Sequence, residues 1–133
     1  MSIGTIIALI NSMSNSFQVL IISENPDTQE ELKKNLARLG CKAKLINTAE
    51  NGIEELKTIS YDAIFADLCV REKGGRSIAR WVKNESIQTK VFIVTSWKGE
   101  LDPHLLQVDG IHAVIHKPFI FSEIRDKLLE HIG

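Results

Sequence analysis

From Phe17 onward, short uninterrupted apolar runs alternate with longer segments in which apolar residues recur at helical spacing. The apolar runs are Val19–Ile22, Ala63–Ala66, Val91–Val94 and Ala113–Ile115, and a further strand is expected at Ala43–Ile46. Short runs without polar interruption are typical of parallel strands that helices cover on both faces. The pattern therefore predicts a doubly wound α/β domain, with a five-stranded parallel sheet, five helices and right-handed crossovers.

Capping residues stand where this pattern needs helix ends. The predicted N-caps are Asn25, Thr48, Asp102 and Ser122, and Pro26 and Pro103 follow two of them at the first helical position. Gly40 is the predicted end of the first helix. The second helix is expected over about 49–59, with Ile53, Leu56 and Ile59 on its inner face.

The chain has 133 residues, the length of one ordinary domain. Residues 1–16 are expected to be an N-terminal extension, because an apolar run from Ile3 to Ile10 is followed by a polar, turn-prone tract. Residues 17–133 then form the domain. The apolar run is far shorter than the roughly 20 residues of a membrane span and lacks the basic start of a signal peptide, so no membrane attachment is expected.

Charge and cysteine content exclude further classes. The 16 Lys and Arg residues against 17 Asp and Glu residues give a formal net charge of −1, so no overall field draws the chain to nucleic acid or to an anionic membrane. Cys41 and Cys69 are too few for a disulfide framework. Free thiols in a reducing cytoplasm are the expected state.

Polar residues that follow the predicted strands are the candidates for function, because ligands of doubly wound sheets bind at the carboxyl ends of the strands. Four of these ends carry Ser23-Glu24, Asp67, Thr95-Ser96 and Lys117. Glu24 and Asp67 offer oxygen ligands of the kind that Mg²⁺ prefers, and a lysine and a hydroxyl beside them can hold phosphoryl oxygens. The set indicates phosphoryl transfer to an aspartate, since a metal-bound carboxylate next to a cation can carry a phosphoryl group as an acyl phosphate.

Three segments make the chain similar to a known family. They are the apolar run that ends in Asp67, with Gly75 eight residues later; the segment Val91–Ser96; and the segment Val114–Phe119, which contains Lys117-Pro118. Together they resemble the receiver domain of two-component response regulators, over about Phe17 to Ile132. The resemblance implies the flavodoxin-like strand order 2-1-3-4-5 and a role in signal transduction.

The resemblance also implies a role for each site residue. Asp67 is the expected phosphoacceptor and takes phosphate from a histidine kinase or a phosphotransfer protein. Glu24, Asp67 and the backbone carbonyl of Cys69 are the expected Mg²⁺ ligands. Thr95 is the hydroxyl that moves toward the phosphoryl group, and Lys117 pairs with its oxygens. The bond between Lys117 and Pro118 is expected to be cis.

Several positions depart from the family pattern and predict an atypical receiver. Ser23 stands where the first acidic residue is expected, so the Mg²⁺ site should be weak. Val70-Arg71 replaces a Met-Pro pair. Val114 occupies the place of the aromatic switch residue, without which the usual relay from threonine to aromatic ring cannot operate.

These departures leave two functions open. The first is a phosphoacceptor module that switches a protein-binding surface, with no enzymatic activity beyond self-catalysed phosphoryl transfer to and from Asp67. The second is a pseudo-receiver that docks to a partner without phosphorylation. A flavin protein, a phosphatase or a nucleotide-binding enzyme on the same fold is disfavoured, because their phosphate-binding loops and paired aspartates are absent from the sequence.

No output domain is expected after the last predicted helix, so output is expected to pass through a partner protein unless the chain is an excised part of a longer protein. In the family, the surface of the fourth helix, fifth strand and last helix makes such contacts. It corresponds here to Leu101–Val108, His112–Ile115 and Ser122–Ile132. The same surface can also support a homodimer.

Overall fold

The structure is a computed structural model that describes residues 17–68, 74–85, 87–97 and 102–132. The strands are β1 (Gln18–Ile22), β2 (Lys42–Ile46), β3 (Ala63–Asp67), β4 (Lys90–Thr95) and β5 (Ala113–His116). The helices are α2 (Pro26–Arg38), α3 (Ala49–Thr58), α4 (Gly75–Asn84), α5 (Pro103–Asp109) and α6 (Phe121–Ile132). The predicted N-terminal extension, residues 1–16, lies outside the described residues.

All five strands form one parallel sheet in the order β2-β1-β3-β4-β5. This order confirms the prediction for strand arrangement. It places β1 and β3 side by side in the centre, with Ile22 opposite Ala66 near their carboxyl ends. The residues that follow β1, β3, β4 and β5 therefore emerge at one edge of the sheet, where the candidate site was expected.

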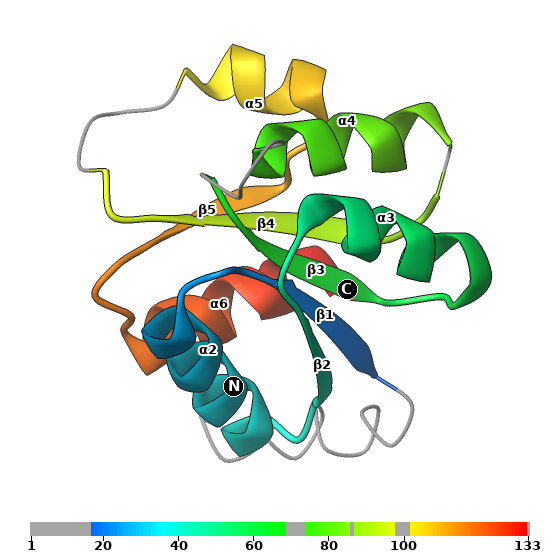
Figure 1. Ribbon diagram of the computed structural model, residues 1–133. Helices are drawn as coiled ribbons and strands as arrows, with labels where there is room; N and C mark the ends of the chain where they lie inside the picture. Colours follow the sequence, from blue (N-terminus) through cyan, green and yellow to red (C-terminus); the bar gives the residue numbers. More distant parts are fainter. Residues whose placement is uncertain (1–16, 69–73, 86, 98–101, 133) are drawn as a thin grey trace.

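Helices cover both faces of the sheet (Figure 1). One apolar core lies between the sheet and α2 with α6, and a second lies between the sheet and α3, α4 and α5. Because side chains alternate along a strand, Val19 and Ile21 face the first core while Leu20 and Ile22 face the second. This two-sided burial is the physical reason why β1, β3 and β4 are apolar along their central residues, whereas the edge strand β2 contains the exposed residues Lys42 and Lys44.

Most predicted helix ends are confirmed. Asn25, Thr48 and Asp102 each accept a backbone N–H from the first turn of α2, α3 and α5, respectively. Gly40 adopts a positive φ of 80° just after α2, a conformation that glycine tolerates best.

Two predictions of local detail were wrong. Ser122 is not the cap of the last helix but lies inside α6, which begins at Phe121, and the backbone carbonyl of Ile120 accepts the amides of Glu123 and Ile124. Ile59 does not face the core, because α3 ends at Thr58 and the extended residue after it turns its side chain to solvent, 41% exposed.

None of the helices in the described part of the chain is long and apolar enough to cross a membrane.

Candidate functional site

Asp67 is the last residue of β3, and its side chain is held by two other strand ends. Lys117 Nζ donates to Asp67 Oδ1 at 3.0 Å, and Ser23 Oγ donates to Asp67 Oδ2 at 2.5 Å. The side chain of Asp67 is 14% exposed and that of Lys117 is 23% exposed, so the ion pair is largely shielded from solvent. The structure thus brings together three of the residues that the sequence placed at strand ends.

Ser23 follows β1 and is completely buried. Its backbone N–H donates to the carbonyl of Ile46, its own carbonyl accepts from Gln29 Nε2 at 2.5 Å, and its Oγ accepts the N–H of Asn25 at 3.1 Å. Asn25 was predicted only as a helix cap, and Gln29 was not predicted to take part. No sequence pattern indicates that a glutamine in the first turns of a helix contacts the end of the preceding strand, so this contact could not be predicted.

Thr95, the last residue of β4, is almost completely buried, and its Oγ1 accepts the backbone N–H of Trp97 at 3.0 Å. The backbone N–H of Lys117 donates to the carbonyl of Thr95 at 2.8 Å. This bond continues the ladder between β4 and β5 past its last paired residues. The backbone hydrogen bond fixes Lys117 and Thr95 side by side. The peptide bond between Lys117 and Pro118 is cis, as expected.

An open cleft of about 230 Å³ lies over these side chains. Its walls are formed by Glu24, Asn25, Asp67, Leu68, Val94, Thr95, Ser96 and Lys117. The exposed Glu24 is therefore at the same rim as Asp67, as predicted. The predicted roles of Cys69, Val70 and Arg71 fall on residues outside the described part of the chain.

Two glycines allow the chain to return close to Asp67 after β3. A Cβ at Gly75 would lie 2.7 Å from the carbonyl oxygen of Asp67 and 2.7 Å from Ile93 Cδ1. A Cβ at Gly74 would lie 2.7 Å from the carbonyl oxygen of Leu68. The N-terminus of α4 therefore packs directly against the strand end that carries the candidate phosphoacceptor.

Val114 lies on β5 opposite Ile93 of β4. It is half-buried and packs against the core beneath α3, α4 and α5. A valine has a short branched side chain that fits this position without a ring to rotate. The absence of a relay from Thr95 to an aromatic ring stays a prediction.

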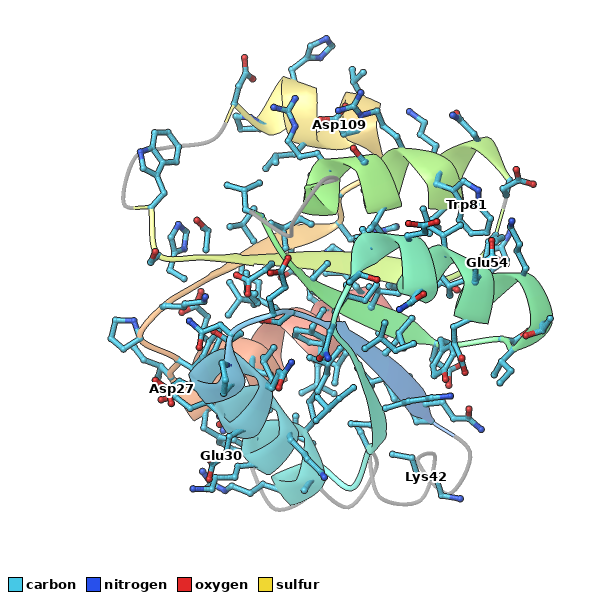
Figure 2. The ribbon with its side chains drawn as sticks, in the orientation of Figure 1. Asp27, Glu30, Lys42, Glu54, Trp81 and Asp109 are labelled. Carbon is cyan, nitrogen blue, oxygen red and sulfur yellow. The ribbon has the colours of Figure 1, made fainter. Side chains whose placement is uncertain are left out.

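A second group of charged residues, which sequence reasoning missed, joins α4 to α5. Asp109 is 6% exposed; its Oδ2 accepts from Arg76 Nε at 2.7 Å, and its Oδ1 pairs with Arg80 Nε at 3.4 Å. Lys83 Nζ donates to the carbonyl of Val108 at 2.9 Å, near the end of α5. Figure 2 shows Asp109 between the two helices. These contacts hold the short helix α5 against α4.

The cleft fits a magnesium ion by its donor chemistry. Asp67 and Glu24 contribute two carboxylates to the cleft, and its volume leaves room for the water molecules that Mg²⁺ retains. Within the described ranges, however, no group of three His, Cys, Asp and Glu side chains is arranged to hold a metal ion. Two carboxylates and the Lys117 ammonium leave a formal charge of −1 at the cleft. This low charge favours weak binding.

Comparison with known proteins identifies the class. The sequence profile of the response regulator receiver domain matches residues 19–129 of this chain. The chain therefore belongs to the response regulator receiver domain family, the receiver modules of two-component phosphorelay signalling.

Individual relatives show the same fold. The receiver domain of a sensor histidine kinase from Pseudomonas aeruginosa, solved with a magnesium ion coordinated in its active site cleft, is 22% identical, with a TM-score of 0.78 over 88% of this chain and 98% of that chain. A chain in the co-crystal structure of the Saccharomyces cerevisiae histidine phosphotransfer protein Ypd1 with the receiver domain of Ssk1 is 18% identical, with a TM-score of 0.76 over 86% of this chain and 88% of that chain.

A curated relative, ethylene receptor 2 of Arabidopsis thaliana, is 26% identical over 133 residues, which cover 90% of this chain. The chain spans only 17% of the length of that receptor. The similarity thus concerns one region of a much longer protein.

Proposed function

We propose that this chain is a signalling receiver that is phosphorylated on Asp67, in a Mg²⁺-dependent reaction, by a histidine kinase or a histidine phosphotransfer protein. The observation that carries the proposal is the contact of Lys117 Nζ with Asp67 Oδ1 at 3.0 Å, at the rim of an open polar cleft. A carboxylate beside a fixed cation is suited to accept a phosphoryl group, because the cation offsets the negative charge that accumulates as the group arrives.

The proposed reaction is an in-line transfer. A carboxylate oxygen of Asp67 attacks the phosphorus of a phosphohistidine, the oxygen–phosphorus bond forms, and the phosphorus–nitrogen bond breaks. The imidazole leaves with the electron pair and takes up a proton. Lys117 stays paired with the new phosphoryl group, and the hydroxyl of Thr95 donates a hydrogen bond to one of its oxygens. Mg²⁺ held by Asp67 and Glu24 would supply further neutralisation of phosphoryl charge.

Loss of the phosphoryl group is proposed to follow from attack of water on the acyl phosphate. This self-catalysed transfer to and from Asp67 is the only catalytic activity that we propose for the chain. Until that hydrolysis, the phosphoryl group stays on Asp67 as a signal. The chain therefore acts as a switch between an unmodified and a phosphorylated form.

The partners are proposed to use two surfaces. The donor of phosphate approaches the cleft, in keeping with the co-crystal of a receiver domain with a histidine phosphotransfer protein among the related structures. A downstream protein, or a second copy of the chain, contacts the surface of α5, β5 and α6, where Val108 is 51% exposed. A cytoplasmic location is proposed because Cys41 is a free, buried thiol.

The proposal is tested with phosphoramidate, a phosphorylated amine that stands in for phosphohistidine. Intact-mass spectrometry should record addition of one phosphoryl group to the chain in the presence of Mg²⁺. The matched variant Asp67→Asn should gain none, because an amide is a poor nucleophile. If the chain gains no phosphoryl group at saturating donor and Mg²⁺, the phosphoacceptor function is rejected.

A second candidate is a pseudo-receiver that binds its partner without phosphorylation. It is favoured by Ser23, whose hydroxyl already satisfies Asp67 Oδ2, and by Val114, which cannot act as an aromatic switch. A partner captured equally well by the unmodified chain and by Asp67→Asn, with no gain on treatment with phosphoramidate, would support this alternative.

A further inference from the structure

We propose that Ser23 controls the divalent-cation affinity of the cleft by competing with the cation for Asp67 Oδ2. The inference rests on the proposed function, because the cation site and the phosphoacceptor share one carboxylate. It concerns a step before phosphorylation, namely how the cation enters the cleft. Ser23 would thus act as a positioning residue that sets how strongly Asp67 binds a cation.

The direction of the Ser23 hydroxyl follows from its neighbours. A serine hydroxyl has one proton and two acceptor lone pairs, and an ionised carboxylate is an acceptor only. Ser23 Oγ lies 2.5 Å from Asp67 Oδ2 and 3.1 Å from the backbone nitrogen of Asn25. The N–H of Asn25 uses one lone pair of the hydroxyl oxygen, so the proton of Ser23 must point at Asp67.

The Ser23 proton uses one of the two lone pairs of Asp67 Oδ2, so a cation at this oxygen is limited to the other lone pair and lies close to the hydroxyl proton. The same carboxylate oxygen cannot keep its short hydrogen bond to Ser23 at full strength and also donate electron density to the ion. Hydrogen bonds to charged groups are among the strong ones in proteins, so breaking this bond opposes cation binding.

Ser23 is also unable to move aside as a whole. It is completely buried, its backbone N–H is bonded to Ile46, and its carbonyl is bonded to Gln29. Only rotation of its hydroxyl can relieve the conflict, and that rotation gives up the bond to Asp67. The competition is thus built into the end of β1 and does not depend on an exposed side chain.

The other oxygen of Asp67 does not offer a free alternative. Oδ1 accepts from Lys117 Nζ at 3.0 Å, so a cation there would face an ammonium group. Each oxygen of the carboxylate therefore already accepts one hydrogen bond from the protein's own donors. A cation at either oxygen must compete with one of these donors.

The test is a Mg²⁺ titration followed by amide NMR shifts of residues around the cleft, for the unmodified chain and three variants. Ser23→Ala removes the competing proton and should raise Mg²⁺ affinity by about tenfold, the size expected for loss of one hydrogen bond to a charged group. Ser23→Asp adds a carboxylate and should raise the affinity further. Asp67→Asn should abolish the saturable shifts.

The sign of the Ser23→Ala effect distinguishes two opposite roles of the serine. If Ser23 instead holds the cation, directly or through a water molecule, the alanine variant will bind Mg²⁺ more weakly. A weaker or unchanged affinity in this variant, with a fold verified by its amide spectrum, overturns the proposal.

Ser23→Gly provides a second test if the alanine variant fails to fold, because it also removes the hydroxyl without adding a ligand. An affinity no higher than that of the unmodified chain overturns the proposal. Phosphorylation by phosphoramidate is measured separately by mass. If the Mg²⁺ titrations overturn the role of Ser23, the mass measurement of Asp67 phosphorylation is still valid. If Asp67 is not phosphorylated, the Mg²⁺ affinities still test the role of Ser23.

Discussion

Lys117 Nζ lies 3.0 Å from Asp67 Oδ1, although fifty residues separate the two along the chain. The contact exists because β4 lies between β3 and β5 in the sheet, and the parallel strands end at the same edge. The carboxylate that is proposed to accept phosphate is thus paired with a cation before any phosphate arrives.

We expect Lys117→Met to slow phosphorylation of Asp67 by phosphoramidate by about a hundredfold, the effect typical of removing one group that stabilises developing negative charge. The rate is measured by intact-mass spectrometry. Lys42→Met is the matched control, because Lys42 lies on β2 at the opposite edge of the sheet (Figure 2) and is exposed. An undiminished rate in the Lys117 variant would exclude a role for its ammonium in the transfer.

Asp109→Asn should lower the free energy of unfolding by about 2 kcal/mol, because it removes the charge that two arginines bind in a buried position. Urea unfolding measures the effect. Asp126→Asn is the control: its carboxylate pairs with Arg125 but is 64% exposed, so a change below about 0.5 kcal/mol is expected. Equal effects of the two substitutions would contradict the importance of the α4–α5 contact.

Gly75→Ala is expected to destabilise the domain by about 1–3 kcal/mol and to disturb Asp67, since the new Cβ would lie 2.7 Å from the carbonyl oxygen of Asp67. Unfolding experiments report the first effect, and amide NMR shifts near Asp67 report the second. Ser77→Ala, two residues further along α4, controls for substitution in the same helix. A stable Gly75→Ala variant with an undisturbed spectrum would refute the close approach.

The stability of the domain should fall as the pH drops below about 6.5. Burial lowers the pKa of His112, as do the charges of Lys90 and His131, and its Nδ1 accepts the N–H of Val91 at 3.0 Å. The folded state therefore favours the neutral ring. The unfolded state binds more protons below the ordinary pKa, so stability that is present above it is lost on acidification.

Urea unfolding at about pH 7.5 and about pH 5.5 measures this dependence. His112→Asn should flatten it, because an amide oxygen can accept from Val91 without titrating. His104→Asn, at an exposed position on α5, should leave it unchanged. If the free energy of unfolding of the His112 variant depends on pH as strongly as that of the unmodified chain, other titrating groups cause the dependence.

Trp97→Ala should weaken binding of the phosphate donor or of a downstream protein, because the Trp97 side chain is 52% exposed next to the cleft, and exposed aromatic residues often anchor interfaces. The backbone N–H of Trp97 still binds Thr95 in the variant, so the cleft should be preserved. Binding to a purified phosphotransfer protein is measured by calorimetry. Normal binding to every partner would remove Trp97 from the contact surface.

The amino-acid sequence by itself determined the strands, most helix ends and the strand-end candidates Asp67, Thr95 and Lys117. These features depend on the period of apolar residues and on capping groups a few residues apart, which act locally. The order of the strands was predicted by the resemblance to the receiver family. The receiver domain match over residues 19–129 confirms that resemblance, and the sheet confirms the order.

The tertiary structure decided which polar atoms meet. The Ser23 hydroxyl reaches Asp67 across 44 positions of sequence, and Arg76 reaches Asp109 across 33, and no local pattern encodes either contact. Ser23 was recognised from the sequence as a missing acidic residue. Only the packing of β1 beside β3 revealed that its hydroxyl binds Asp67, because the position of a side chain at a strand end is set by neighbouring strands rather than by adjacent residues.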